Sequence, residues 1–344
     1  METNECRVCV TGGAGYIASA LIWKLLDEGY TVHATLRNLG DASKVDILKT
    51  LPNANSRLLL FQANIYNPIE FEHAINGCQY VFHLASPLQH TEGYQFKNTT
   101  EAAVATAKTI ATSCVRSGVR RLIYAASIVS ASPLKDDGSG YKDSMDETCW
   151  TPLSLSANFS DDHLAAYRDS KTLSEKEILS YGSSIEEGRG LEVVTLGIGL
   201  VGGDNSLLSY TPGSVALFIS HLVDKVYGPY GYKALKYLEE LGGKIPIVHV
   251  NDVCDAFIFG LNQASINGRF LCASSFVSSV EIAEYYQENH PEFPIKQEYL
   301  EGTKREVQWG STRLIEKGFE YKCDMKMILD DCVRCARRTG YLQK

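Results

Sequence analysis

The stretch Val8-Cys9-Val10-Thr11-Gly12-Gly13-Ala14-Gly15-Tyr16-Ile17-Ala18-Ser19 decides the fold. A β-branched run ends in a glycine turn, and apolar residues then recur at helical spacing as far as Leu26. Gly12 permits a tight turn, Gly15 leaves room for a phosphate, and the start of the following helix offers N–H groups. The third small position of the pattern is Ala18, which suffices because only close helix–strand packing is needed there.

This unit predicts a pyrophosphate site for a dinucleotide, although an ordinary strand–helix turn would show the same spacing. The residues that we expect to line the site are Thr11, Gly12, Gly15, Tyr16 and Ile17.

The overall composition is that of a globular protein. The chain has 344 residues, of which 44% are hydrophobic and 22% charged, and its net charge is −8. This charge argues against nucleic acid or an anionic membrane surface as the main partner. No apolar run approaches the roughly 18 residues of a membrane span, and the first residues show no secretory signal. We therefore expect a cytoplasmic protein, with monomer as the simplest state.

The ten cysteines are scattered, as is typical of a reduced protein. Cys332 and Cys335 form a C-x-x-C pair within an apolar helical stripe at residues 325–337, and we interpret them as core residues; Cys6 and Cys9 have the same spacing. We predict no metal site.

Strand-like and helix-like segments alternate through the first part of the chain. Apolar runs at residues 31–36, 58–63, 80–85, 121–127 and 191–196 are separated by helical patterns. This alternation predicts an α/β fold with a doubly wound, Rossmann-type parallel sheet.

The alternation of strand-like and helix-like segments stops at two places, and these suggest the domain division. We expect a dinucleotide-binding domain over residues 1–196, which includes a helix at 163–180 and to which residues 245–263 return. Residues 197–244 and 264–344 are expected to form a smaller, mostly helical domain that binds the substrate and covers it.

The end of the second strand carries cations where an acidic residue would favour NAD. Arg37 ends the strand and Lys44 follows within the next segment, and both suit a 2′-phosphate. The prediction is NADPH, with a solvated surface arginine as the alternative. Asn64 is a candidate to bind the adenine. Further cofactor contacts are expected at strand ends, from Ile65, Leu84, Ala85, Ser86, Leu196, Gly197 and Gly199.

The candidate chemistry lies in Ser127, Tyr167 and Lys171. Residues four apart share one face of a helix, so Lys171 should lie near Tyr167. An ammonium there should lower the pKa of the phenol and make it a general acid for an alkoxide that forms as hydride arrives. Lys171 is also expected to hold the nicotinamide ribose. Ser127 ends the neighbouring strand and would stabilise the developing charge.

These motifs resemble those of the extended short-chain dehydrogenases/reductases, and within them the plant group of dihydroflavonol, anthocyanidin and cinnamoyl-CoA reductases. The resemblance runs from residue 7 to about 340. Segments at residues 31–38 and 130–134 look closest to the HC-toxin reductase branch. The resemblance to the whole plant group is carried by Val10–Ser19, Thr35-Leu36-Arg37, Val81–Pro87, Tyr167–Lys171, His249–Ala256 and Gly268–Cys272. It implies NADPH, the Ser/Tyr/Lys triad, and aromatic or polyketide-like carbonyl substrates of plant secondary metabolism, such as flavonoids.

Several positions depart from that group. Ser127 follows Ala125-Ala126 where Thr-Ser is usual, and Gly197 replaces an expected proline. Ser132 stands where dihydroflavonol reductases place an asparagine, which weakens dihydroflavonol as the substrate. The Asn-Trp-Tyr-Cys signature of cinnamoyl-CoA reductases is absent, so a CoA thioester is not expected.

The sequence therefore predicts a reductase of a small aromatic molecule, with three alternatives. An anthocyanidin-reductase-like enzyme would reduce a conjugated C=C or flavylium system with the same residues. A sugar-nucleotide epimerase would share the fold, and a non-catalytic protein could bind NADPH only as a sensor. The substrate contacts are expected from Ser86, Ser127, Ser132, Tyr167, Phe218, His221, Leu222 and Tyr227.

Overall fold

The structure is a computed structural model that describes residues 6–87, 90, 92–137, 139–153, 157–182, 190–223, 227–302 and 305–343. The chain forms two compact units. The first comprises the residues up to Ala126, Asp169–Leu196 and Cys254–Phe270, and the second comprises Ser127–Arg168, Gly197–Val253 and the residues from Leu271 onward.

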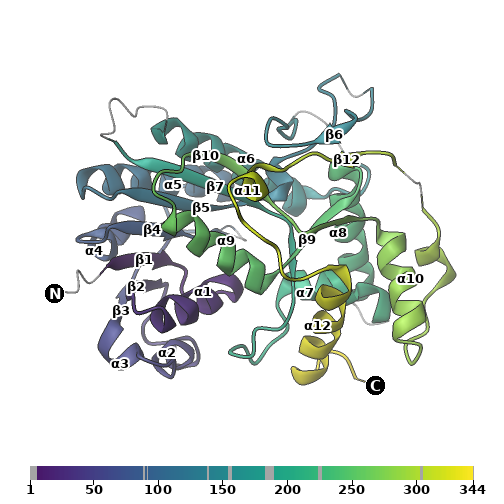
Figure 1. Ribbon diagram of the computed structural model, residues 1–344, viewed down its shortest axis with the longest axis horizontal. Helices are drawn as coiled ribbons and strands as arrows, with labels where there is room; N and C mark the ends of the chain where they lie inside the picture. Colours follow the sequence, from purple (N-terminus) through teal and green to yellow (C-terminus); the bar gives the residue numbers. More distant parts are fainter. Residues whose placement is uncertain are drawn as a thin grey trace. The chain divides into compact units, whose positions relative to one another are not determined.

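The first unit is built on a seven-stranded sheet with the order β10-β7-β5-β4-β1-β2-β3 (Figure 1). The pairs β1–β2, β1–β4, β2–β3 and β4–β5 are all parallel. The strands are β1 (Arg7–Thr11), β2 (Thr31–Leu36), β3 (Leu58–Gln62), β4 (Tyr80–His83), β5 (Arg121–Ser127), β7 (Glu192–Ile198) and β10 (Gly268–Cys272). The predicted Rossmann-type fold is confirmed.

Helices cover both faces of this sheet. They are α1 (Tyr16–Asp27), α2 (Ala42–Lys49), α3 (Ala54–Arg57), α4 (Phe71–Ile75), α5 (Thr99–Arg116), α6 (Asp162–Gly182) and α9 (Val250–Asn262). Phe257 of α9 packs edge-on against Phe82 of β4 on one face. The opposite face carries Cys9, Val81 and Tyr124, which form one buried cluster with side chains of α4, α5 and α6.

Alternation along the strands places polar residues on that second face too. Successive side chains of a strand point to opposite sides, so Thr11 shares the face of Cys9 and His83 shares that of Val81. Thr11 is fully buried and His83 is 2% exposed, so both need hydrogen-bond partners inside the fold.

The second unit contains two small sheets, of order β11-β9-β8 and β12-β6. Its strands are β6 (Ser144–Met145), β8 (Leu200–Gly202), β9 (Ile245–His249), β11 (Ser275–Val277) and β12 (Gln308–Trp309). Its helices are α7 (Gly213–Phe218), α8 (Tyr227–Gly242), α10 (Ser279–Asn289), α11 (Arg313–Glu316) and α12 (Met325–Arg338).

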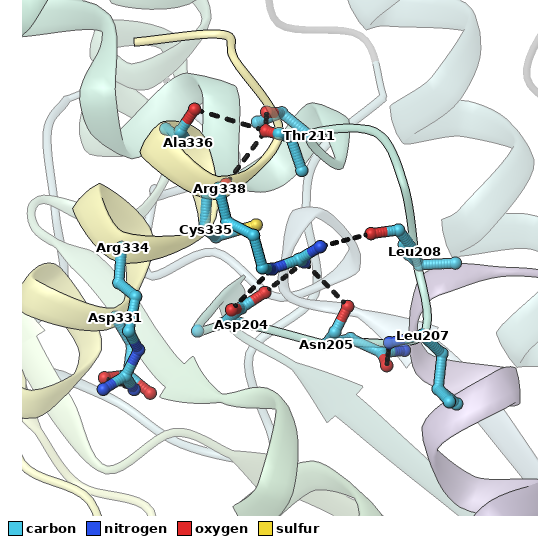
Figure 2. Close-up of polar contacts among 12 residues, drawn as sticks. Asp204, Asn205, Leu207, Leu208, Thr211, Asp331, Arg334, Cys335, Ala336 and Arg338 are labelled. Carbon is cyan, nitrogen blue, oxygen red and sulfur yellow. Dashed lines mark hydrogen bonds and ion pairs between the residues drawn. The ribbon is translucent and has the colours of Figure 1, made fainter. Parts of the chain in front are cut away.

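The last helix holds the segment that follows β8. Arg338 of α12 donates to both carboxylate oxygens of Asp204, at 3.0 and 2.5 Å, and to the carbonyl oxygens of Asn205 and Leu208 (Figure 2). A planar guanidinium is suited to this because it offers five donors in a fixed fork. Arg338 thus clamps a loop more than 120 residues away in sequence.

Two strands differ from the predicted domain division. Residues 245–249 were expected to return to the dinucleotide-binding domain, but β9 pairs with β8 and β11 instead. Residues 264–344 were assigned to the substrate domain, whereas β10 is the edge strand of the seven-stranded sheet. Short buried strands carry the same apolar pattern in either sheet, so composition could not separate them. Residues 127–168 also group with the second unit rather than the first.

Candidate functional site

The glycine turn joins β1 to α1. Gly12 has φ of +72°, a left-handed conformation that favours glycine, and an added Cβ would lie 3.2 Å from the Cα of Ala85. A Cβ at Gly15 would meet only the carbonyl oxygen of Gly12. Gly15 caps α1, and neither a side-chain cap nor an acidic residue satisfies the first turn of that helix. The helix start is therefore suited to an anion.

Thr11, immediately before the turn, ties it to the end of β4. Its hydroxyl oxygen accepts from the N–H groups of Leu84 and Ala85, each at 3.0 Å, and lies 2.9 Å from Nδ1 of His83. Leu84, Ala85 and the following Ser86 are half-buried beside the turn, where the sequence predicted cofactor contacts.

The end of β2 is polar and open. Arg37 follows Leu36 directly and its side chain is exposed. Among the described residues Arg37 has no ion-pair partner, so its charge is available to a ligand. Lys44 is partly exposed in the first turn of α2.

Asn64 is less open than the sequence suggested. Its Nδ2 donates to the hydroxyl of Tyr94 at 2.9 Å, and its Oδ1 accepts from the N–H of Tyr66 at 3.1 Å. One Nδ2 hydrogen and one Oδ1 lone pair are not used by these two bonds. The carbonyl of the next residue, Ile65, accepts from Thr106.

Lys171 lies on α6 and points into the first unit. It is 7% exposed, and its Nζ donates to Oγ of Ser86 at 2.7 Å and to the carbonyl oxygen of Ala125 at 2.9 Å. Burial lowers the pKa of Lys171 to about 8, and the nearby Glu175 opposes that shift. A small pocket beside it is lined by Ser86, His83, Tyr124 and Ser174, among others.

Ser127 and Tyr167 meet in the second unit. Tyr167 lies one helical turn before Lys171 on α6 and forms a hydrogen bond with Ser127, the last residue of β5. Its ring packs on the apolar cluster of Val129, Tyr237 and Leu241.

The pKa of Tyr167 is raised, because burial disfavours the phenolate more than the bond with Ser127 favours it. The expected lowering of this pKa is therefore wrong. The phenol is protonated at neutral pH and has a proton to give.

The end of β7 and the residue that follows it are tightly packed. Leu196 and Gly197 are buried in β7, and the N–H of Gly199 donates to the carbonyl of Cys272 at 2.9 Å. A Cβ at Gly199 would come within 2.7 Å of the carbonyl oxygen of Pro246 on β9, so only glycine fits.

Most of the predicted substrate residues of the second unit are buried in its interior. Ser132 is fully buried, and its hydroxyl donates to the carbonyl of Leu241 at 2.5 Å and accepts from Leu134. Phe218 and His221 are 0% and 3% exposed, and Leu222 is 9% exposed. These side chains therefore pack in the interior of the second unit. The side chain of Tyr227 lies outside the described residues.

The cysteine pair on α12 is buried as well. Burial raises the pKa of the Cys332 thiol strongly and that of Cys335 to about 12. Thiols in this state react slowly with oxidants, because the thiolate is the nucleophile. In the described part of the chain, no group of three or more acidic, His or Cys side chains could hold a metal ion.

Comparison with known proteins decides the family. A profile described as the NAD dependent epimerase/dehydratase family matches residues 8–273. The chain belongs to this family. A putative anthocyanidin reductase of Ginkgo biloba is 31% identical over 97% of this chain and 95% of the relative. Noscapine synthase SDR1 of Papaver somniferum is 32% identical over 99% of this chain and 95% of the relative.

A solved structure supports the same family. The crystal structure of vestitone reductase from alfalfa (Medicago sativa) matches with a TM-score of 0.77 and 30% identity, and covers 98% of this chain and 99% of that one. The resemblance to the extended short-chain dehydrogenases/reductases is confirmed, and the chain is an oxidoreductase that uses a nicotinamide cofactor. No helix among the described residues is long and apolar enough to cross a membrane.

The residues fit such a cofactor. The turn at Gly12 and Gly15 would hold its pyrophosphate at the start of α1, where no side chain competes for the N–H groups. Lys171 uses two of its three N–H donors on Ser86 and Ala125, so one remains for a ribose hydroxyl.

Two residues beside Lys171 were not predicted from the sequence. Tyr124 lies 5.2 Å, centroid to nitrogen, from the Lys171 ammonium. Ser174 is 1% exposed with an Oγ that has no hydrogen-bond partner, and it lies one turn after Ser170 beside the same pocket. The one sequence signal that could have indicated Ser174 is its spacing of three residues from Lys171, which places both on one face of the helix.

Proposed function

We propose that the protein is an NADPH-dependent reductase that transfers hydride to a carbonyl, or to a conjugated system, of a plant aromatic secondary metabolite such as a flavonoid or a polyketide-type ketone. The observation that carries this proposal is Lys171, held by Ser86 and Ala125 one helical turn after Tyr167. The names of the relatives, anthocyanidin reductase and vestitone reductase, support the substrate class.

The reaction divides among three side chains of the protein. Bound NADPH would supply the hydride. Tyr167 donates its proton to the substrate oxygen, because its raised pKa keeps the phenol protonated at neutral pH. Ser127, which already bonds to Tyr167, donates a hydrogen bond to the same oxygen and stabilises its charge. Lys171 holds the nicotinamide ribose.

The preference for NADPH over NADH rests on the end of β2. Arg37 is exposed there, and Lys44 follows in the first turn of α2. A guanidinium binds a phosphate through parallel charged hydrogen bonds, whereas an acidic residue at this place would favour the ribose of NADH.

A second candidate is reduction of a conjugated C=C or flavylium system, as the name of the Ginkgo biloba relative suggests. The same three residues would serve, and the position of the added hydrogens in the product separates the two reactions. A non-catalytic NADPH sensor would have no need for the Ser127–Tyr167 pair.

We further propose that the enzyme works in the cytoplasm as a monomer. All ten cysteines are free thiols, which suits a reducing compartment.

The test is an NADPH-oxidation assay against flavonoid, styrylpyrone and aromatic ketone or aldehyde substrates, with Tyr167→Phe and Tyr181→Phe compared. Tyr181 lies on the same helix and bonds to Thr112, so its substitution is the matched control. We expect Tyr167→Phe to lose at least about 100-fold in kcat while binding NADPH normally. Tyr181→Phe should keep the wild-type rate. Full activity in Tyr167→Phe would overturn the proposed role, and a wild type that oxidises NADPH with none of these substrates would overturn the substrate class.

A further inference from the structure

The hydrogen-bond acceptors of the Lys171 ammonium are neutral groups. Its two hydrogen bonds go to the hydroxyl of Ser86 and the carbonyl of Ala125. Glu175, whose charge acts on Lys171, is itself paired with Arg269 at 2.9 Å. A buried cation needs compensation, and a further partner is the face of the Tyr124 ring, 5.2 Å away.

The Tyr124 ring also contacts a buried histidine. It is 3% exposed on β5, and the His83 ring lies against it with centroids 5.3 Å apart and the planes tilted by 34°. The lysine and the histidine therefore both contact one aromatic ring.

The hydrogen bonds of Thr11 fix the state of that histidine. The Thr11 oxygen already accepts from two backbone N–H groups, those of Leu84 and Ala85. Its single proton is left for Nδ1 of His83, 2.9 Å away, so the ring carries its own proton on Nε2. Burial and the Lys171 charge lower the pKa of His83 to about 3, which keeps the ring neutral. A neutral ring can pack beside Tyr124 without repelling the ammonium.

We propose that Tyr124 is a positioning residue for Lys171: its ring face holds the ammonium, and His83, fixed by Thr11, holds the ring. The chain of contacts connects the residue before the glycine turn with the lysine that holds the ribose. The inference rests on the proposed function, and it adds to it a contact that the Ser/Tyr/Lys pattern does not contain.

The proposal requires an aromatic ring at position 124, and an aliphatic side chain that only fills the space does not meet it. The attraction comes from the negative face of the aromatic ring, so phenylalanine should replace Tyr124 whereas leucine should not. Phe71 provides the matched control, since it is 1% exposed and packs in the same buried cluster without contacting Lys171.

The experiment compares Tyr124→Phe, Tyr124→Leu and Phe71→Leu by titration with NADPH and by kcat and KM. We expect Tyr124→Leu to raise the Kd for NADPH and lower kcat by about tenfold, with KM changed less. Tyr124→Phe should stay within about twofold of wild type, and Phe71→Leu should lower the melting temperature but keep the Kd. Equal Kd and kcat in Tyr124→Leu and wild type would overturn the proposal.

A second series of variants controls for changes in folding. Phenylalanine, difluorophenylalanine and trifluorophenylalanine incorporated at position 124 keep the ring shape while fluorine withdraws charge from its face. The Kd for NADPH should rise stepwise with fluorine number, and a flat series would contradict the role. If wild type binds NADPH and the series is flat, only this inference fails. If wild type does not bind NADPH, the proposed function fails.

Discussion

Replacing Lys171 by methionine should stabilise the protein as it removes the activity. The buried ammonium has its pKa lowered from 10.5 to about 8, so holding the charge costs about 3 kcal/mol in the folded state, at about 1.4 kcal/mol per pKa unit. Methionine removes that cost but also loses the bonds to Ser86 and Ala125, each worth about 1 kcal/mol. The net gain in free energy of unfolding at pH 7 is about 1 kcal/mol.

The pH dependence is the sharper part of this prediction. Below pH 8 the folded and unfolded chains both hold the proton, so wild type bears the full cost. Between about pH 8 and 10.5 the folded protein releases the proton while the unfolded chain keeps it, and wild-type stability rises relative to the variant. The difference between the two proteins should thus shift by about 3 kcal/mol in favour of wild type across this range.

Urea unfolding of both proteins at pH 7, 8, 9 and 10 measures this difference, in which the other titrating groups cancel. Lys97→Met is the control for removing a solvent-exposed lysine. A difference between wild type and Lys171→Met that stays constant from pH 7 to 10 would refute the reasoning. So would NADPH-dependent turnover retained in Lys171→Met.

Three further substitutions test individual contacts of the fold. Gly12→Ala places a side chain at φ of +72°, so it should lower stability by about 1–3 kcal/mol and weaken NADPH binding in a titration. Arg121→Met leaves Glu192 without the buried guanidinium that lies 2.9 Å from it, and urea unfolding should show a loss of about 3–5 kcal/mol. Arg338→Met removes the clamp on Asp204, so limited proteolysis should cut near residues 204–211 faster, with a loss of about 1–3 kcal/mol. Wild-type behaviour in any one of the three would contradict the corresponding contact.

The local parts of the site could be predicted because they depend on neighbours in sequence. A glycine turn between strand and helix, a cation at the end of β2, and two residues four apart on α6 each follow from spacing alone. The contact of Lys171 with Ser86 joins residues 85 positions apart, and both lie where the carboxyl ends of parallel strands meet the helix.

The parts that depend on distant partners could not be predicted. Ser132 was expected to face the substrate, but its hydroxyl bonds to a carbonyl 109 residues away. The pKa of Tyr167 was expected to fall, but burial by side chains of α8 outweighs the local effect. Tyr124 had no signal at all, because an aromatic residue in a buried strand is normally a packing residue.

The measurement that tests the central claim most directly is calorimetric titration of the protein with NADPH and with NADH, on wild type, Arg37→Asp and the charge control Lys317→Asp. We expect wild type and Lys317→Asp to prefer NADPH. Arg37→Asp should lose at least about tenfold in NADPH affinity, since a charged hydrogen bond to phosphate is worth about 1.5–3 kcal/mol. Equal affinity of wild type for both nucleotides would contradict the NADPH assignment, and binding of neither would contradict the reductase function.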